Sequence, residues 1–361
     1  MSGGLLKLKL AQLKALSTSL GLPSSGTKGA LSDAILRAST VASAQIANNK
    51  NKRPGPLVVK SVDMGVRNLS LVNLHSSFLG VSGTIESKLK TSGQIGISQW
   101  KRLDVEKGFR PDAWTPDISS FDVERLATIA HALVQREFFL PRIDGSSGEE
   151  AGRRALTPPA YWPDVILIER QRFRSGSSTS ILEWTIRVNM LENMLHAILH
   201  TLAPPGTVVV ASVNPKAVLA YWTLRTGATR SAKGYKETKA FKTQLAAAIL
   251  NSPGPKSQAT QGLNGSSESK IPLINNLSGL KLETAPRGFN LLDDDSRDVA
   301  RILGAAKVKD DDLADSFLQG LAWLEWMHGR QRLAAAIRAQ DNSDMATAQL
   351  ADFVIEEFGL E

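Results

Sequence analysis

The stretch Leu57-Val58-Val59-Lys60-Ser61-Val62-Asp63-Met64-Gly65 (57–65) decides how the rest of the chain is interpreted. Its apolar residues predict a strand over residues 57–62, which ends at an acidic residue and is followed by a turn. A second strand is predicted over residues 69–74, and the Gly- and Ser-rich stretch after it can hold a third strand ending near Trp100. Three consecutive strands therefore open the main domain.

A second apolar run, Val165-Ile166-Leu167-Ile168, follows Pro163 and is typical of a buried central strand. Another buried strand is predicted over residues 207–213. The remaining predicted elements are helices over residues 119–140, 180–202, 233–250 and 310–328. This order of elements predicts an α/β fold in which a mixed sheet is flanked by helices.

The first 38 residues predict two short helices with a basic surface, and Gly21 and Pro23 end the first helix. This stretch resembles the SAP motif, a helix–turn–helix module that binds DNA, and the resemblance implies that Lys28 contacts DNA. The likeness rests on Leu10, Leu13, Leu16, Gly21-Leu22, Gly26, Lys28, Leu31 and Leu36. The acid-free start also fits a mitochondrial targeting helix, so both interpretations stay open.

Residues 39–56 predict a basic linker, because their second half is polar, rich in Lys and Arg, and interrupted by Pro and Gly. The predicted division is therefore a small N-terminal helical module at residues 1–38, a linker at 39–56 and a main domain at 57–361.

The composition excludes several kinds of site. The chain has 361 residues and no cysteine, which excludes disulfides, thiolate metal sites and cysteine nucleophiles. No apolar run is long enough to span a membrane, so we expect no membrane partner. No phosphate-binding loop of the form Gly-x-x-x-x-Gly-Lys-Ser/Thr is present, so we expect no nucleotide cofactor.

The formal net charge of +8 is unevenly distributed along the chain. Residues 1–60 hold nine Lys and Arg against one acid, whereas residues 293–361 hold fifteen acids against seven basic residues. A basic front followed by an acidic end indicates a nucleic-acid-binding protein that concentrates carboxylates in one place. A solvated basic tail is the alternative.

Acidic residues interrupt the apolar patterns at three places, and they are the candidates for catalysis and metal binding: Asp63, Glu169, Asp311, Asp312 and Asp315. The first two end predicted strands, and the other three open the last predicted helix, where spacings of three and four residues share one face. Gathered carboxylates raise one another's pKa, and a divalent cation relieves the repulsion. Oxygen ligands select Mg²⁺ or Mn²⁺. Taken singly, these acids also fit a turn or a helix cap.

Three segments together resemble the fungal mitochondrial Holliday-junction resolvases, which are relatives of bacterial RuvC in the ribonuclease-H-like superfamily. The segments are Asp63-Met64-Gly65-x-x-Asn68, Ile168-Glu169-Arg170-Gln171-Arg172 and Lys309-Asp310-Asp311-Asp312-Leu313-Ala314-Asp315-Ser316. The resemblance implies a ribonuclease-H-like sheet and a homodimeric, mitochondrial, Mg²⁺-dependent endonuclease that nicks two opposed strands of a four-way DNA junction.

The resemblance also implies a role for each acid. Asp63 would bridge two metal ions, Glu169 would bind one of them, and Asp315 with either Asp311 or Asp312 would complete the set. The run of three acids at residues 310–312 leaves the register of the first helical ligand open. Mn²⁺ would substitute for Mg²⁺ at such a site.

Basic residues near these motifs are candidates for contacts with DNA phosphates: Arg170, Arg172, Arg174, Lys216, Lys233, Lys236 and Lys239. Solvated side chains without a ligand are the alternative for each of them. Two other functions also stay open, namely a ribonuclease-H-like nuclease that cuts RNA–DNA hybrids or flaps, and a junction-binding scaffold without catalysis.

Overall fold

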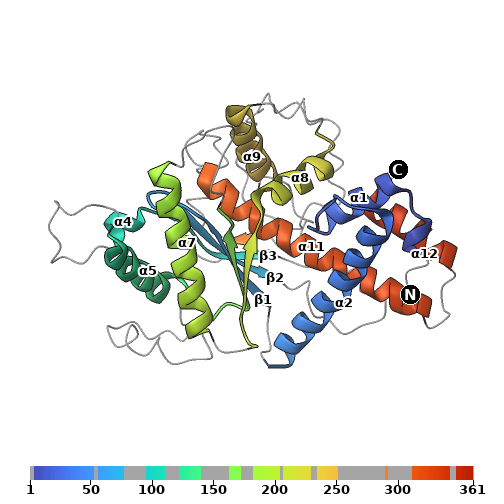
Figure 1. Cartoon of the computed structure of the whole chain (residues 1–361), viewed down its shortest axis with the longest axis horizontal. Helices are drawn as coiled ribbons and strands as arrows, with labels where there is room; N and C mark the ends of the chain where they lie inside the picture. Colours follow the sequence, from blue (N-terminus) through green and yellow to red (C-terminus); the bar gives the residue numbers. More distant parts are fainter. Residues whose placement is uncertain are drawn as a thin grey trace, which may run out of the picture.

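A mixed sheet lies between two groups of helices in the computed structural model of the chain (Figure 1). The structure describes residues 4–52, 56–76, 95–109, 122–139, 162–171, 182–203, 206–228, 234–250, 289–291, 311–341 and 347–360. Because the two helical groups cover opposite faces, each face of the sheet carries its own apolar core.

Among the described residues, the sheet has six strands in the order β5-β4-β1-β2-β3-β6. They are β1 (Leu57–Asp63), β2 (Leu69–Ser76), β3 (Ile95–Leu103), β4 (Val165–Glu169), β5 (Val209–Val213) and β6 (Phe289–Leu291). The first three strands are antiparallel neighbours, whereas β4 runs parallel to β1 and β5 runs parallel to β4. This arrangement confirms the predicted mixed sheet.

Two details of the sheet differ from prediction. The strand predicted at residues 207–213 was expected to be buried, but β5 is an edge strand in which only Val213 is fully buried. An edge strand has a neighbour on one side only, so an apolar run does not distinguish it from a central strand. The short strand β6 was not predicted, and it extends the other edge beside β3.

Side chains alternate between the two faces of the sheet along β1, so each face packs against a different group of helices. One face packs against α8 (Pro215–Thr226), α9 (Tyr235–Leu250) and α11 (Asp311–Asp341). The other face packs against α4 (Val105–Gly108), α5 (Val123–Glu137) and α7 (Glu183–Leu202). The four predicted helices correspond to α5, α7, α9 and α11.

A buried polar network occupies the face of the sheet that α5 covers. Lys60 has no exposed surface, and its Nζ donates to Gln99 Oε1 at 2.7 Å. Gln99 Nε2 donates to Glu137 Oε2 at 3.2 Å, and Lys101 Nζ lies 2.5 Å from the same carboxylate oxygen. Burial lowers the pKa of Lys60 to about 7, although the Glu137 carboxylate acts in the opposite direction.

The N-terminal segment is not packed as a separate unit. It forms η1 (Leu5–Lys7), α1 (Leu10–Ser19) and α2 (Lys28–Lys52), so the predicted linker is helical as far as Lys52. The apolar side chains of α1 and α2 share one core with the end of α11 and with α12 (Thr347–Phe358). The core of the N-terminal helices is therefore completed by residues from the other end of the sequence.

Arg330 of α11 fixes the turn between α1 and α2. Its Nη2 and Nε donate to the Leu20 carbonyl at 2.7 and 3.0 Å. Gly21 has a φ of 66°, and a β-carbon at this position would overlap the Trp326 ring. The helix that carries the acidic candidates at its start is thus held by the N-terminal helices near its other end.

Candidate active site

Two carboxylates lie side by side at the carboxyl ends of the central strands β1 and β4, because these strands are parallel neighbours. Val62 is paired with Ile168 in the register of these strands, so the residues that follow, Asp63 and Glu169, end their strands together. Asp63 is only 8% exposed. The structure therefore places the acids that end these two strands next to each other.

The start of helix α11 lies at the same carboxyl ends of β1 and β4. Gly320 lets the helix approach closely, since a β-carbon there would lie 2.7 Å from Leu74 Cδ1. Gln319 Nε2 donates to Ser61 Oγ and to the Val62 carbonyl, at 3.1 Å in both cases. These contacts fix α11 against β1, and Asp315, one turn earlier on the helix, lies in the hollow with Asp63.

The electrostatic environment links the acids of the strands to those of α11. Burial raises the pKa of Asp63 well above its ordinary value, and the charges of Glu169, Asp315 and Asp312 raise it further. Burial also raises the pKa of Asp315 to about 6, against the opposing effect of a neighbouring lysine. Like charges are thus held together at a cost to the fold, which is a property of functional sites.

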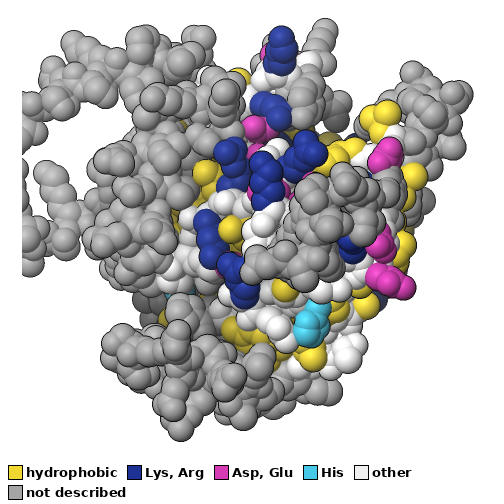
Figure 2. All heavy atoms as spheres, turned by 90° about the vertical axis from the view of Figure 1, so that its left-hand side faces the viewer, with side chains coloured by type: hydrophobic (Ala, Val, Ile, Leu, Met, Phe, Trp, Pro, Cys, Tyr) yellow, Lys and Arg dark blue, Asp and Glu magenta, His cyan; other side chains and the backbone are white. Residues whose placement is uncertain are grey.

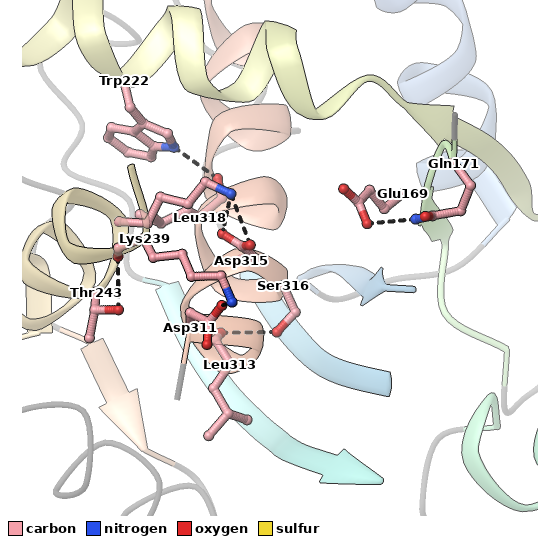
Figure 3. Close-up of polar contacts among 11 residues, drawn as sticks. Glu169, Gln171, Trp222, Lys239, Thr243, Asp311, Leu313, Asp315, Ser316 and Leu318 are labelled. Atoms are coloured by element: carbon pink, nitrogen blue, oxygen red, sulfur yellow. Dashed lines mark hydrogen bonds and ion pairs between the residues drawn. The ribbon is translucent and has the colours of Figure 1, made fainter. Parts of the chain in front are cut away.

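Two lysines of α9 face the acids of α11 (Figure 3). Lys242 Nζ lies 2.8 and 2.9 Å from the two carboxylate oxygens of Asp315. Lys239 forms an ion pair with Asp311, and the more distant Arg102 lies 3.9 Å from Asp312. Lys239 therefore contacts a carboxylate in this structure, where the sequence predicted a contact with DNA.

One carboxylate oxygen of Glu169 contacts Gln171, in the segment that follows its own strand (Figure 3). Gln171 Nε2 donates to Glu169 Oε2 at 2.8 Å, while the Gln171 backbone N–H donates to Glu192 Oε2 at 2.9 Å. Burial raises the pKa of Glu192, and the charge of Glu169 adds to that effect. Glu192 of α7 is thus a further buried acid behind the site.

A hollow of about 380 Å³ opens between the strand ends and the helices. Asp63, Glu169 and Asp315 line it together with Lys242 and Gln319, and the buried Trp222 forms part of its wall. The Trp222 indole N–H donates to the Leu318 carbonyl at 3.0 Å, which fixes α8 against α11. The hollow therefore has rigid walls and an acidic lining.

The donor set fits a hard divalent cation, because it consists of carboxylate oxygens whose mutual repulsion such an ion would relieve. Within the described residues, however, no three His, Asp or Glu side chains converge closely enough to hold an ion as they stand. The ion pairs with Lys239 and Lys242 account for part of this separation, since they hold two of the carboxylates toward α9.

The remaining basic candidates for DNA contacts differ in exposure, and some of them lie outside the described residues. Arg170, Lys216 and Lys236 are exposed, and Lys28 of α2 is half-buried, whereas Arg172, Arg174 and Lys233 lie outside the described residues. Figure 2 shows Lys and Arg side chains gathered across the middle of the face that carries α4, α5 and α7.

Among the described helices, none combines the length and apolarity that crossing a bilayer requires.

Sequence reasoning missed two residues of the site, Gln319 and Glu192, and it placed Lys242 only among the basic residues of a helix that could follow a DNA backbone. Gln319 follows Asp315 by four residues, so its helical spacing was a readable signal. Lys242 belongs to a predicted helix whose packing partner was unknown. Glu192 had no distinguishing signal, because an acid in an amphipathic helix is usually solvated.

Comparison with known proteins identifies relatives of the chain. "Cruciform cutting endonuclease 1, mitochondrial" of Saccharomyces cerevisiae is 30% identical over 211 residues, which cover 53% of this chain and 56% of that one. The protein of the same name from Schizosaccharomyces pombe is 29% identical over 173 residues, covering 45% of this chain and 51% of that one. The chain thus spans about half the length of the curated relatives it matches.

A solved structure described as the yeast mitochondrial Holliday junction resolvase Ydc2 aligns with a TM-score of 0.47 and 20% identity, covering 90% of this chain and 95% of that one. The family model described as "Mitochondrial resolvase Ydc2 / RNA splicing MRS1" matches residues 59–142 and 154–333, which include all five acidic candidates. The chain therefore belongs to the Ydc2 family of mitochondrial resolvases and RNA-splicing proteins.

Proposed function

We propose that the chain is a structure-selective endonuclease that resolves four-way DNA junctions. One observation carries the proposal: Asp63 is buried between the charges of Glu169 and Asp315 at the strand ends, in a chain of a resolvase family. A fold that only bound DNA would gain nothing from holding these carboxylates together, because their repulsion destabilises it. The two curated relatives, named as cruciform-cutting endonucleases of mitochondria, support the same substrate and compartment.

In the proposed mechanism, Asp63, Glu169 and Asp315, together with Asp311 or Asp312, would hold two Mg²⁺ or Mn²⁺ ions. The ions would supply an activated water and stabilise the leaving oxygen of the phosphodiester. Gln319 keeps α11 seated on β1, so that Asp315 stays close to Asp63 while DNA binds.

The positive charges around the site position the DNA in this proposal. Arg170 follows Glu169 directly, and Lys216 follows Pro215, which opens α8 and lines the hollow, so both exposed cations lie near the site. Contacts of this kind fix the register of a phosphate backbone without reading bases. Each such contact steepens the loss of DNA affinity with salt.

The proposed assembly is a homodimer, because a four-way junction has approximate two-fold symmetry and two paired nicks need two sites. The N-terminal helices, which resemble a SAP module, would add DNA affinity from the side of the molecule where α11 ends. Their likeness to a DNA-binding module stays a prediction.

The test is a cleavage assay on a synthetic mobile four-way junction with Mg²⁺, with the products mapped to single nucleotides. We expect paired, symmetric nicks, and we expect Asp63→Asn and Asp315→Asn to abolish them while junction binding in gel shifts stays intact. Asp352→Asn is the matched control, since Asp352 is exposed on α12 outside the site. Full cleavage by either site variant would contradict the proposal.

A second candidate function follows from the family description, which names an RNA-splicing protein beside the resolvase. A member of this family that bound structured nucleic acid without cutting it would give gel shifts but no Mg²⁺-dependent products. Matched junction, duplex, flap and RNA–DNA hybrid substrates of the same sequence separate junction resolution from both this function and a different ribonuclease-H-like nuclease.

A further inference from the structure

The two ion pairs between α9 and α11 have a regular geometry. Lys239 and Lys242 are three residues apart on α9, and their partners Asp311 and Asp315 are four residues apart on α11, so both pairs lie along one contact line between the helices. The Lys242 side chain is 21% exposed, and its ammonium group contacts both oxygens of Asp315. The contact is therefore sheltered from solvent, unlike a surface ion pair.

Lys242 is also the one basic side chain among the described residues that line the acidic hollow. Burial alone would lower the pKa of Lys242, but the net effect of its surroundings is to raise it. Asp315 makes the largest contribution to this rise, and the charges of Asp63 and Glu169 add to it. The ammonium group thus interacts with the carboxylates of both strand ends as well as with that of α11. The ammonium group therefore lies among carboxylates whose mutual repulsion a positive charge relieves.

Resting on the proposed function, we propose that Lys242, with Lys239 behind it, is a built-in counterion that holds the acids of α11 while the site lacks metal and is displaced when metal enters. An Asp315 carboxylate cannot keep both of its oxygens on the ammonium group and also turn toward Asp63 to share an ion. Metal binding and the Lys242–Asp315 contact are therefore mutually exclusive, and each weakens the other by the same factor.

Displacement gives the freed ammonium groups a second partner. They project from α9 at the edge of the hollow, where the phosphate of a bound strand would lie in the proposed complex. The same two lysines would neutralise carboxylates before metal binds and phosphates afterward. Metal loading would in this way prepare the surface for DNA, and α9 would act as a positioning element.

The first test uses the wild-type protein, so that it does not depend on the folding of a variant. Surface amines are reductively methylated with formaldehyde in the absence of DNA, with and without saturating Mn²⁺, and the modified peptides are quantified by mass spectrometry. We expect Lys242 to react slowly without metal and about fivefold or more faster with it. Lys236, exposed one turn before Lys239 on the same helix, is the internal control and should not change.

The second test measures Mn²⁺ binding by calorimetry for the wild type, Lys242→Met and Lys236→Met. Removing the competing ammonium group should tighten Mn²⁺ binding by about fivefold or more in Lys242→Met, and Lys236→Met should match the wild type. Equal or weaker Mn²⁺ binding by folded Lys242→Met would overturn the inference, as would unchanged Lys242 labelling in metal-bound wild type.

Failure of this inference is distinguishable from failure of the proposed function. If Mn²⁺ binds and supports junction cleavage while the Lys242 labelling does not change, only the counterion role is wrong. If the wild-type protein binds no Mn²⁺ at all, both the counterion role and the proposed metal site are wrong.

Discussion

Two buried ionisable side chains on strand β1, Lys60 and Asp63, have opposite environments although they are only three residues apart. Lys60 is fully buried on the face covered by α5, where Gln99 Oε1 accepts a hydrogen bond from its ammonium group and the Glu137 carboxylate lies close by. Asp63 is buried on the face covered by α11, where its charged neighbours are further acids.

The difference shows how a fold separates structure from function along one strand. A buried charge with complementary neighbours contributes to a specific packing arrangement, and removing its partner leaves a charge without compensation. A buried charge among like charges destabilises the protein alone and becomes favourable only when a cation is supplied. The comparison therefore predicts that variants on the two faces change different properties.

The largest expected effect is that of Asp63→Asn on activity. Loss of this central carboxylate should lower junction cleavage by at least about 10³-fold. The same change relieves repulsion, so the metal-free protein should become more stable by about 1 to 3 kcal/mol. Cleavage kinetics and urea unfolding of one preparation measure both effects. A variant that lost both activity and stability would contradict the comparison.

On the other face, Glu137→Gln should destabilise the protein by about 3 kcal/mol, because it leaves Lys60 and Lys101 without their shared carboxylate. Urea unfolding followed by circular dichroism measures the change. Junction cleavage by the folded fraction should equal that of the wild type, since the network lies outside the hollow. Unchanged stability would mean that the network is dispensable.

The acidic site should also give the metal-free protein an unusual pH dependence. The pKa of Asp315 is about 6 in the folded state and its ordinary value is 3.8, so the folded state binds the proton more tightly. Stability from this group is complete below about pH 4 and is lost as the pH rises through 6, by about 1 to 3 kcal/mol. Asp315→Asn should flatten this decline in thermal melts between pH 4 and 7, and an unchanged slope would assign it to other groups.

The smallest expected effect is that of Lys60→Met, and it has the opposite dependence on pH. The pKa of Lys60 is lowered to about 7, so the folded state binds fewer protons than the unfolded state between pH 7 and 10.5, and wild-type stability rises with pH there. Any stability that the variant gains at pH 6 should therefore shrink by about 1 kcal/mol at pH 8. A gain that did not depend on pH would show that Lys60 stays protonated in the folded protein over this range.

Much of the fold was predictable because its strands are unusually apolar. The runs at residues 57–62 and 165–168 identified β1 and β4, and the acid that ends each run identified the strand half of the site. Helix α8 was missed although Asn214 caps it, Pro215 opens it and Gly227 follows it, which are readable signals. Its apolar residues do not form a clear stripe, so periodicity did not reveal it.

The part of the site that sequence could not supply depends on contacts between distant elements. Lys239 was predicted to bind DNA because it lies in a basic segment, but its partner Asp311 is on another helix. Nothing in the spacing of either segment reveals that α9 lies against α11. The same reason applies to the N-terminal helices, whose core is completed by residues of α11 and α12.

The shared core of the two chain ends has a consequence for the order of folding. Gln12 Nε2 donates to the Leu360 carbonyl across 348 positions of sequence, and Leu13 and Leu16 share their core with Val354. Helices α1 and α2 must therefore wait, with an apolar face exposed, until α12 has been synthesised. Contacts this distant form late and slowly, so the terminal bundle should be the last part of the protein to mature and the part most dependent on chaperones.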